Sequence, residues 1–299
     1  MDNGYRPRRR IEERAAHVWH AQLQMEPSTA RTLSELLSPD ESFRAQRFRF
    51  VRDYETYVVS RGLLRLLLSY YLDLPPPEIR FIYGPYGKPA LAPECGRLEF
   101  NLSHSKGLVA YVFSPHREVG VDIEFVCPKR ADWQVARQCF SLREIESLQK
   151  VPSELFTEAF FACWTRKEAY IKARGVGVSL ALDQFDVSVE PGEQPALLGS
   201  RENPQEASRW TFKDLNLVPE FKGALAVEGH NLDVEFFRWP DDCIAAQSAH
   251  AGAIPATDGL GKGGGIQVDL AGSTDNFSRI LQPWATSSGK DREPNRISA

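Results

Sequence analysis

The sequence predicts an α+β protein with two similar subdomains related by pseudo-twofold symmetry. Each subdomain is expected to be a long helix packed on a small, mainly antiparallel sheet, with a ligand cleft between the two. Two observations lead to this fold class. The same order of elements occurs twice within residues 16–243, about 110 residues apart. Each copy is one long helical segment followed by short strand-like segments, an order that can bury one helix face on one sheet face.

In the first copy we expect a helix over residues 54–73, followed by strand segments within 80–91, 97–103, 106–113 and 120–125. In the second copy we expect a helix over 154–175, followed by strand segments within 185–198, 209–217, 222–229 and 232–237. Pro-Ala-Leu, Lys-Gly and Asp-x-Glu-Phe stand at corresponding places in both copies. The shared order favours internal duplication, although each piece is short enough for chance similarity to be the alternative.

The two copies define an N-terminal half over residues 16–126 and a C-terminal half over 127–243. A basic tail over 1–15 precedes them, and a tail over 244–299 follows. The last segment is rich in Gly, Ser, Ala and Asp with little periodicity, which is typical of disordered chain. Its "GLGKGGG" resembles a phosphate-binding loop, but Ala256 stands where such a loop needs its first glycine and no apolar strand precedes it. We interpret this piece as a flexible linker.

Composition limits the compartment and the partners. The five cysteines among the 299 residues form no CxxC pair and no Cys/His cluster suited to zinc, so we expect reduced thiols in the cytoplasm. No apolar region follows the basic N-terminus and no run of about 18 apolar residues occurs, so we expect neither secretion nor a membrane partner. The net charge of −4 gives no general attraction to nucleic acid.

Two carboxylates lie side by side in the predicted strand "GVDIEF". Alternation places Gly120, Asp122 and Glu124 on one face, with the two carboxylate residues roughly 6.5 to 7 Å apart at Cα. Neighbouring like charges repel each other unless water or a cation separates them. Hard oxygen ligands of this kind suit Mg²⁺, which commonly binds one or two carboxylates together with phosphate oxygens. A plain solvated strand face is the alternative.

The second long helix contains a lysine within its apolar stripe. With Phe156 as the origin of a helical projection, Lys167 lies about 20° from the centre of the stripe. Glu168 and Lys172 follow as neighbours one turn apart. Lys167 could extend its ammonium to solvent while the other two form a surface ion pair. A phosphate bound beside the helix would account for all three residues, because lysine suits phosphate and the carboxylate could share its cation.

Other segments add basic and hydrogen-bonding groups. The turn "YGPYGKPAL" presents Lys88, and Gly87 lets the backbone approach a ligand closely. The segment "NLSHSKG" is expected to expose Ser103, His104 and Ser105 near a turn, with His104 suited to contact a phosphate. Adjacent strand residues point to opposite faces, so Ser103 and His104 make a poor nucleophile pair. Six arginines stand earlier in the chain: Arg44, Arg47, Arg49, Arg52, Arg61 and Arg65. We interpret one or two of them as phosphate contacts and the others as surface residues.

Five motifs stand in a characteristic order between about Leu37 and Phe237. They are "RF" with a following "RD", then "YGKP", "NLSHS", "GVDIE" and "WTRKEAYIK". In this order and spacing the sequence resembles the Sfp-type 4′-phosphopantetheinyl transferases. The resemblance implies two α+β halves with coenzyme A in the cleft between them and Mg²⁺ on its pyrophosphate. It also implies transfer of 4′-phosphopantetheine to a serine of an acyl or peptidyl carrier protein.

The resemblance also implies roles for individual residues. The metal ligands would be Asp122, Glu124 and Glu168, with Glu168 and Lys172 as the catalytic pair. The coenzyme A contacts would be Arg44, Arg47, Gly87, Lys88, Ser103, His104, Lys167 and Lys172. One position departs from the pattern, because Glu41 stands where the family often has a further lysine. Binding of the 3′-phosphate of coenzyme A would then depend more on Arg44, Arg47 and His104.

These residues predict a mechanism and a set of partners. Glu168 would take the serine proton, directly or through a metal-bound water, and the lysines would stabilise charge on the leaving side. The carrier protein is expected to dock through apolar contacts around "CFSLREIESL", and one chain that supplies both halves is expected to be a monomer. The alternatives are a non-catalytic coenzyme A-binding module and an unrelated Mg²⁺-dependent phosphotransferase. The first would have lost a motif residue, and the second would need its own nucleotide loop.

Overall fold

The computed structural model describes residues 10–239. Residues 1–9 of the predicted basic tail and the predicted tail over 244–299 lie outside this range. The first strand begins at Ala15, the last residue assigned to the N-terminal tail. Within the described range, no helix is both long and apolar enough to cross a membrane.

The elements follow the predicted order. The helices are α1 (Pro27–Ser34), α2 (Pro39–Gln46), α3 (Val51–Leu72), α4 (Trp133–Cys139), α5 (Leu142–Lys150) and α6 (Phe156–Arg174). The strands of the first half are β1 (Ala15–Gln22), β2 (Phe81–Tyr83), β3 (Pro89–Leu91), β4 (Glu99–Ser105), β5 (Leu108–Ser114) and β6 (Val119–Phe125). Those of the second half are β7 (Phe185–Val187), β8 (Leu197–Ser200), β9 (Trp210–Asp214), β10 (Phe221–Glu228) and β11 (Asp233–Arg238). Each copy is thus a long helix, a short hairpin and three strands, and the predicted α+β class is confirmed.

The last strand of each copy joins the sheet of the other copy. β6 ends the first copy and pairs antiparallel with β10 in the sheet β6–β10–β9. β11 ends the second copy and pairs in parallel with β1 in the sheet β11–β1–β5–β4. Hydrogen-bonded strands therefore cross the predicted boundary between residues 126 and 127, and the described residues 10–239 belong to one compact unit. The division into 16–126 and 127–243 stays a prediction about sequence repetition.

The helix α3 covers one face of the β11–β1–β5–β4 sheet. Leu63 and Leu67 of α3 belong to the same buried cluster as Trp19, Tyr111 and other side chains of that face. Their spacing of four residues places them on one side of the helix. The apolar stripe of α3 is thereby buried against the first sheet.

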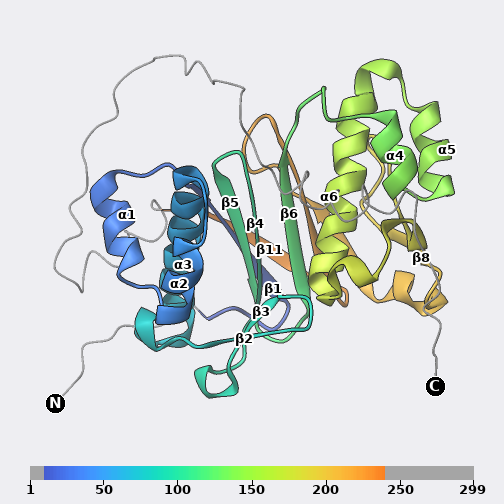
Figure 1. Cartoon of the computed structure of the whole chain (residues 1–299). Helices are drawn as coiled ribbons and strands as arrows, with labels where there is room; N and C mark the ends of the chain where they lie inside the picture. The colour runs from blue at the N-terminus through green and yellow to red at the C-terminus, as the bar shows by residue number, and fades with distance from the viewer. Residues whose placement is uncertain (1–9, 240–299) are drawn as a thin grey trace, which may run out of the picture. The chain divides into compact units, whose positions relative to one another are not determined.

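The opposite face of this sheet packs on the second sheet. Val18 and Val112 of the first sheet share a buried cluster with Val121 of β6 and Leu225 of β10. Figure 1 shows α3 on one side of the strands and α6 on the other. The described part of the chain is therefore layered as helix, sheet, sheet and helix.

β6 and α6 approach each other closely at Gly120. A Cβ atom at this position would lie 2.1 Å from the Ala169 oxygen and 2.3 Å from the Ala173 nitrogen, both in α6. Real side-chain contacts are never this short, so only glycine fits there. The alternation of the strand then carries Asp122 and Glu124 onto the same face, beneath the helix.

The close approach at Gly120 predicts the effect of adding one methyl group. Gly120→Ala should lower the free energy of unfolding by about 3 kcal/mol, because the clashing atoms are backbone atoms that cannot rotate away. Gly199→Ala in β8 is the matched control, since its added Cβ would meet nothing closer than Asp186 Oδ2 at 3.6 Å. Urea unfolding of both variants tests this. Equal stability of the two would show that α6 does not rest on β6 in this way.

Candidate active site

The two carboxylates of β6 are buried beneath α6. Asp122 and Glu124 are each only 3% exposed. They lie on the face of β6 that carries Gly120, as the strand alternation predicts. The alternative of a solvated strand face is excluded by this burial. Two buried carboxylates on one strand need compensating positive charge, because an unpaired ionised group is costly away from water.

Lys172 of α6 supplies part of that charge. Its ammonium lies 2.6 Å from Asp122 Oδ1 and donates a second hydrogen bond to Ser103 Oγ at 2.9 Å. An ammonium has three N–H groups, so one remains for a further acceptor. The side chain of Lys172 is 23% exposed, which leaves it accessible from solvent.

Glu168 lies one helical turn before Lys172 and completes a group of three carboxylates. Burial and the charge of Asp122 raise the pKa of Glu168 to about 7, and the same two causes raise the pKa of Glu124 to about 8. Burial also raises the pKa of Asp122, against the effect of Lys172. Burial alone would lower the pKa of Lys172, but the Asp122 and Glu168 carboxylates outweigh it and raise it. The raised pKa values show that the three carboxylates would carry more negative charge than one ammonium neutralises if all of them were ionised.

A cation would suit this group chemically. Asp122 Oδ2 is a buried oxygen with no hydrogen-bond partner among the described residues, while Oδ1 is held by Lys172 and Ser103. Carboxylate oxygens are the ligands that Mg²⁺ prefers. No group of three His, Cys, Asp or Glu side chains within residues 10–239 is arranged as a ready metal site. The ligand chemistry therefore fits a magnesium ion, although the three side chains do not converge on one point.

The predicted phosphate contact Lys88 connects three elements. Its ammonium donates to Ala173 O in the last turn of α6 at 2.7 Å and to Val119 O at the start of β6 at 3.2 Å. Burial lowers the pKa of Lys88. Gly87, beside it, has a positive φ of 82° that favours glycine. These two hydrogen bonds leave one of its three N–H groups for a ligand.

Ser103 and His104 were both predicted to contact coenzyme A, but the structure separates them. Ser103 is 3% exposed and bonds to Asp122 and Lys172. His104 follows on β4 and therefore lies on its other side, the α3 side, with Phe100 and Leu102. Ser103 and Ser105 were expected to be exposed, and this expectation is wrong because both face β6 and are buried.

The predicted phosphate contacts Arg44 and Arg47 lie on the α3 side as well. Both are exposed, at the end of α2, and the Arg44 guanidinium lies 5.8 Å from the centre of the Tyr57 ring. Within residues 10–239 neither forms an ion pair with the carboxylates of β6. The structure therefore divides the predicted site into two groups, one on each side of β4.

Glu41, which departs from the family pattern, has a structural role. It is 1% exposed, and its Oε2 accepts hydrogen bonds from Arg65 Nε at 2.7 Å and from Ser38 N at 3.1 Å. Arg61 is also buried, with Nε 3.9 Å from Glu41 Oε1. The interpretation of Arg61 and Arg65 as surface residues is therefore wrong. Glu41 anchors α2 to α3 at a position where a lysine would meet two buried arginines.

Lys167 requires a correction. It is fully buried, its ammonium lies 2.6 Å from Glu144 Oε1 of α5, and it also donates to Phe185 O at 2.7 Å. Neither solvent nor a ligand reaches this ammonium, so the predicted phosphate contact of Lys167 is wrong. The apolar stripe is interrupted because α5 and β7 supply a partner for the lysine inside the core.

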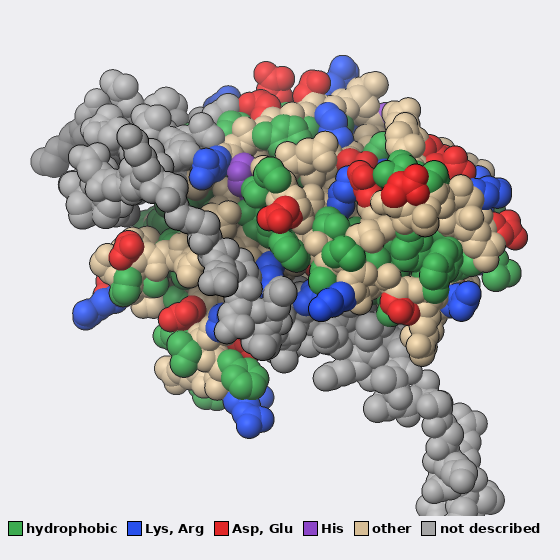
Figure 2. Space-filling model, turned by 90° about the horizontal axis from the view of Figure 1, so that it is seen from above, with side chains coloured by type: hydrophobic (Ala, Val, Ile, Leu, Met, Phe, Trp, Pro, Cys, Tyr) green, Lys and Arg blue, Asp and Glu red, His purple; other side chains and the backbone are tan. Residues whose placement is uncertain are grey.

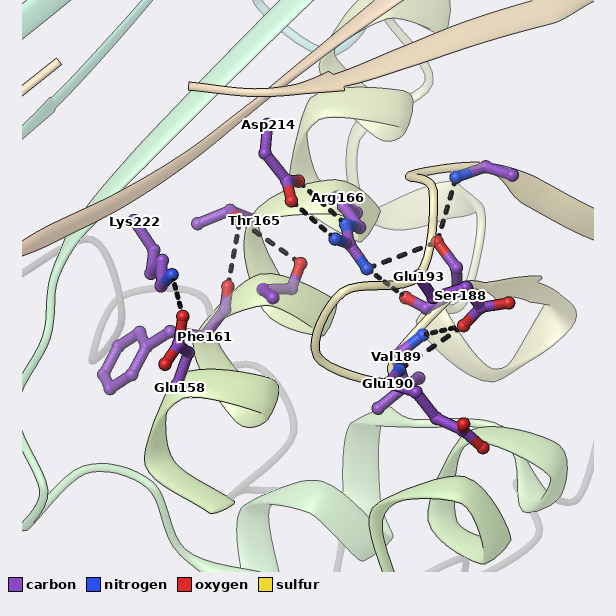
Figure 3. Close-up of polar contacts among 12 residues, drawn as sticks. Glu158, Phe161, Thr165, Arg166, Ser188, Val189, Glu190, Glu193, Asp214 and Lys222 are labelled. Atoms are coloured by element: carbon purple, nitrogen blue, oxygen red, sulfur yellow. Dashed lines mark hydrogen bonds and ion pairs between the residues drawn. The ribbon is translucent and has the colours of Figure 1, made fainter. Parts of the chain in front are cut away.

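Arg166, just before Lys167, is also a structural residue. Its guanidinium forms two hydrogen bonds with the Asp214 carboxylate, at 2.9 and 2.6 Å, and a third with Ser188 O at 2.7 Å (Figure 3). These contacts attach α6 to the end of β9 and to the loop after β7. Three consecutive residues of α6 thus point to three different partners, and Glu168 alone belongs to the carboxylate group.

Sequence reasoning missed two residues. Ser105 donates a hydrogen bond to Glu124 Oε2 at 2.8 Å, and Glu144 neutralises Lys167. The alternation used for β6 could have identified Ser105 as a partner of Ser103 on one face of β4. The capping box of Ser141 and Glu144 predicts the start of α5, but no local pattern in the sequence indicates that Glu144 pairs with a lysine in another helix.

Comparison with known proteins identifies the class. A family described as the 4′-phosphopantetheinyl transferase superfamily matches residues 118–230, and one described as the N-terminal part of 4′-phosphopantetheinyl transferase matches residues 23–116. The chain is 36% identical over 228 residues to the 4′-phosphopantetheinyl transferase HetI of Nostoc sp., an alignment that covers 75% of this chain and 92% of HetI.

Two further relatives carry the same description. The chain is 30% identical over 189 residues to Sfp of Bacillus subtilis, covering 63% of this chain and 81% of Sfp. It is 49% identical over 122 residues to AcpT of Escherichia coli K12, covering 40% of this chain and 58% of AcpT. The chain belongs to the 4′-phosphopantetheinyl transferase superfamily. The predicted family and enzyme class are confirmed.

The buried ion pair of Lys167 predicts a loss of stability on substitution. Lys167→Met should lower the free energy of unfolding by about 3 to 5 kcal/mol, because it leaves the Glu144 carboxylate buried without its counterion. Lys150→Met, at the exposed end of α5, is the control and should unfold like the wild type. Thermal and urea unfolding provide the measurement. A Lys167→Met protein of normal stability but weakened coenzyme A binding would instead restore the phosphate role.

Proposed function

We propose that this enzyme transfers 4′-phosphopantetheine from coenzyme A to a serine hydroxyl of an acyl or peptidyl carrier protein and releases adenosine 3′,5′-bisphosphate. The observation that carries the proposal is the group formed by Asp122, Glu124, Glu168 and Lys172. It brings three carboxylates and an accessible ammonium together in a chain whose relatives are phosphopantetheinyl transferases. Phosphoryl-type transfer depends mainly on positioning and on neutralising charge, which these residues can provide.

The division of the site by β4 supports coenzyme A as the substrate. Arg44, Arg47 and His104 lie on the α3 side, and Lys172 and Lys88 lie beside α6. Coenzyme A carries a 3′-phosphate at one end of its nucleotide and a pyrophosphate at the other. We assign the 3′-phosphate to the arginines and His104, and the pyrophosphate to Lys172 and Lys88, whose remaining N–H groups can donate to its oxygens.

We further propose that Asp122, Glu124 and Glu168 hold Mg²⁺ during the reaction. The raised pKa values of the three carboxyl groups, which an additional cation would lower, and the lack of a hydrogen-bond partner for Asp122 Oδ2 within residues 10–239 support this assignment. When bound, the ion would neutralise charge on the pyrophosphate. Lys172 would contribute to the same neutralisation from the helix side, since its ammonium already lies against Asp122.

The chain's residues then have distinct parts in the transfer. The serine oxygen of the carrier attacks the phosphorus that bears the pantetheine arm, and the bond from this phosphorus to the bridging pyrophosphate oxygen breaks. Glu168, directly or through a water molecule, takes the serine proton, and its pKa of about 7 lets it accept a proton near neutral pH. Lys172 stabilises the negative charge left on the nucleotide phosphate.

The carrier protein is proposed to dock around residues 139–148. Leu142, at the start of α5, is 82% exposed, which is unusual for a large apolar side chain. On the right of Figure 2, over the α4, α5 and α6 side, hydrophobic side chains lie among acidic and basic ones. Such a mixed surface is typical of a transient protein interface. We expect the enzyme to act as a monomer, because the exchanged strands β6 and β11 complete both sheets within one chain.

The transfer reaction gives a direct test. Incubated with coenzyme A, Mg²⁺ and an apo carrier protein, the enzyme should add the mass of one phosphopantetheine to the carrier, as read by intact-mass spectrometry. Glu168→Gln should slow transfer by about 10²-fold to 10⁴-fold, because it removes the proposed base and one metal ligand. Glu158→Gln, an exposed position on the same helix, should transfer like the wild type.

A panel of acyl and peptidyl carrier proteins should be used, since the preferred carrier is a separate question. Coenzyme A binding without transfer to any carrier would support a non-catalytic binding module instead. A fully active Glu168→Gln enzyme would remove Glu168 from the chemistry.

Removal of divalent metal tests the magnesium assignment. Dialysis against a chelator should abolish transfer, and added Mg²⁺ should restore it, while the unfolding midpoint of the protein changes little. The expected reason is that Lys172 partly neutralises the carboxylates in the fold, whereas transfer needs the additional charge. Unchanged transfer after chelation would contradict the role of Mg²⁺.

A further inference from the structure

β4 and β6 are edge strands of different sheets, and their edges meet. Ser103 and Ser105 lie on one face of β4, and their hydroxyls bond to the β6 backbone where a neighbouring strand would otherwise do so. Each accepts a hydrogen bond from a backbone N–H group on the edge of β6, and Asn101 does the same two residues earlier. These bonds are Val121 N to Asn101 Oδ1 at 3.0 Å, Ile123 N to Ser103 Oγ at 3.4 Å and Phe125 N to Ser105 Oγ at 3.2 Å.

The two serines also bond to the carboxylates of the candidate metal site. Ser103 Oγ donates to Asp122 Oδ1 at 2.8 Å, and Ser105 Oγ donates to Glu124 Oε2 at 2.8 Å. The same unit therefore occurs twice, two residues apart along both strands. At the third position Asn101 accepts a hydrogen bond from Val121, the residue after Gly120. Gly120 has no side chain to bond, and α6 comes closest to β6 there. The repeat matches the period of two of a strand.

The direction of each serine hydrogen bond follows from its partners. A backbone N–H group can only donate, so Ser105 Oγ must use a lone pair for Phe125. Its single hydrogen is then left for the Glu124 carboxylate. For Ser103, Ile123 N and the Lys172 ammonium are both donors, so its hydrogen is directed to Asp122 in the same way. Both hydroxyls therefore hold a carboxylate oxygen and favour its ionised form.

Ser105 has no access to substrate. It is 2% exposed, and its hydroxyl is engaged by Glu124 and the backbone of Phe125. Hydrogen bonds to a metal-ligating carboxylate orient it, and removal of such a partner typically weakens metal binding. Ser103 also bonds to Lys172, so a change there would alter two functions at once. Ser105 is the position at which orientation of a carboxylate can be tested alone.

We propose that Ser105 is a positioning residue that orients Glu124 for divalent-cation binding without touching the cation or the substrate. This inference rests on the metal assignment made for the proposed transferase function. Its expected mark is a loss of cation affinity that leaves the chemical step intact once the cation is saturating.

The test uses the full chain and Mn²⁺ as the probe, followed by electron paramagnetic resonance. Ser105→Ala should weaken Mn²⁺ binding by about 10-fold to 100-fold. Ser105→Thr retains a hydroxyl and should bind Mn²⁺ close to the wild type. Ser114→Ala is the matched control, since Ser114 is equally buried in β5 and, within residues 10–239, its hydroxyl bonds to the backbone oxygen of Ala15 and to no carboxylate. In the transfer assay, the Mg²⁺ concentration for half-maximal rate should rise in Ser105→Ala while kcat at saturating Mg²⁺ is retained.

Unfolding midpoints of the three variants separate orientation from general damage. If Ser105→Ala binds Mn²⁺ like the wild type, or if Ser114→Ala loses as much affinity, the role of Ser105 is overturned, whether or not the enzyme transfers phosphopantetheine. If the wild type transfers nothing yet binds Mn²⁺ more tightly than Ser105→Ala, the transferase proposal fails and the role of Ser105 stands. A wild type that binds no divalent cation overturns the metal site and the role of Ser105 together.

Discussion

The candidate active site depends on the contact between β6 and α6 at Gly120. A Cβ atom there would lie 2.1 Å from a helix carbonyl oxygen. Because glycine has no Cβ atom, the strand can run directly against the backbone of the helix. This approach brings Asp122 within 2.6 Å of the Lys172 ammonium. A larger residue at 120 would push the helix away, and the lysine and the carboxylates would separate. The chemistry of the site therefore depends on a residue that has no side chain.

The polar residues of α6 show how one short motif serves both stability and chemistry. Arg166 attaches the helix to β9, and Lys167 forms a buried ion pair with Glu144 of α5. These contacts fix the rotation and the position of the helix. Glu168 and Lys172, on the side that faces β6, are then held in place for function. A buried ion pair is a costly way to stabilise a fold, but it specifies a single orientation, which is what a charged site beside it requires.

Exchange of the last strands makes the site a product of both copies of the repeat. β6 comes from the first copy but pairs with β10 of the second, so the first copy supplies Asp122 and Glu124 and the second supplies the helix with Glu168 and Lys172 that covers them. The open edge of β6 then faces β4, whose serines satisfy its backbone N–H groups and hold its carboxylates. Between β4 and β6, side-chain hydrogen bonds thus take the place of backbone-to-backbone hydrogen bonds. The same serine side chains also bond to the carboxylates of the site.

The sequence by itself determined the order of elements in both copies, the shared strand face of Asp122 and Glu124, and the placement of Glu168 and Lys172 one helical turn apart. These features follow from the periods of strand and helix, which are local. The burial of Lys167, the burial of Ser103 against Asp122 and the bond from Ser105 to Glu124 were decided only by the tertiary structure. Each depends on which strand edge or helix meets which partner across more than 15 residues of chain, as Lys167 and Glu144 do at a separation of 23. Periodicity assigns a residue to a face, but only packing decides what that face meets.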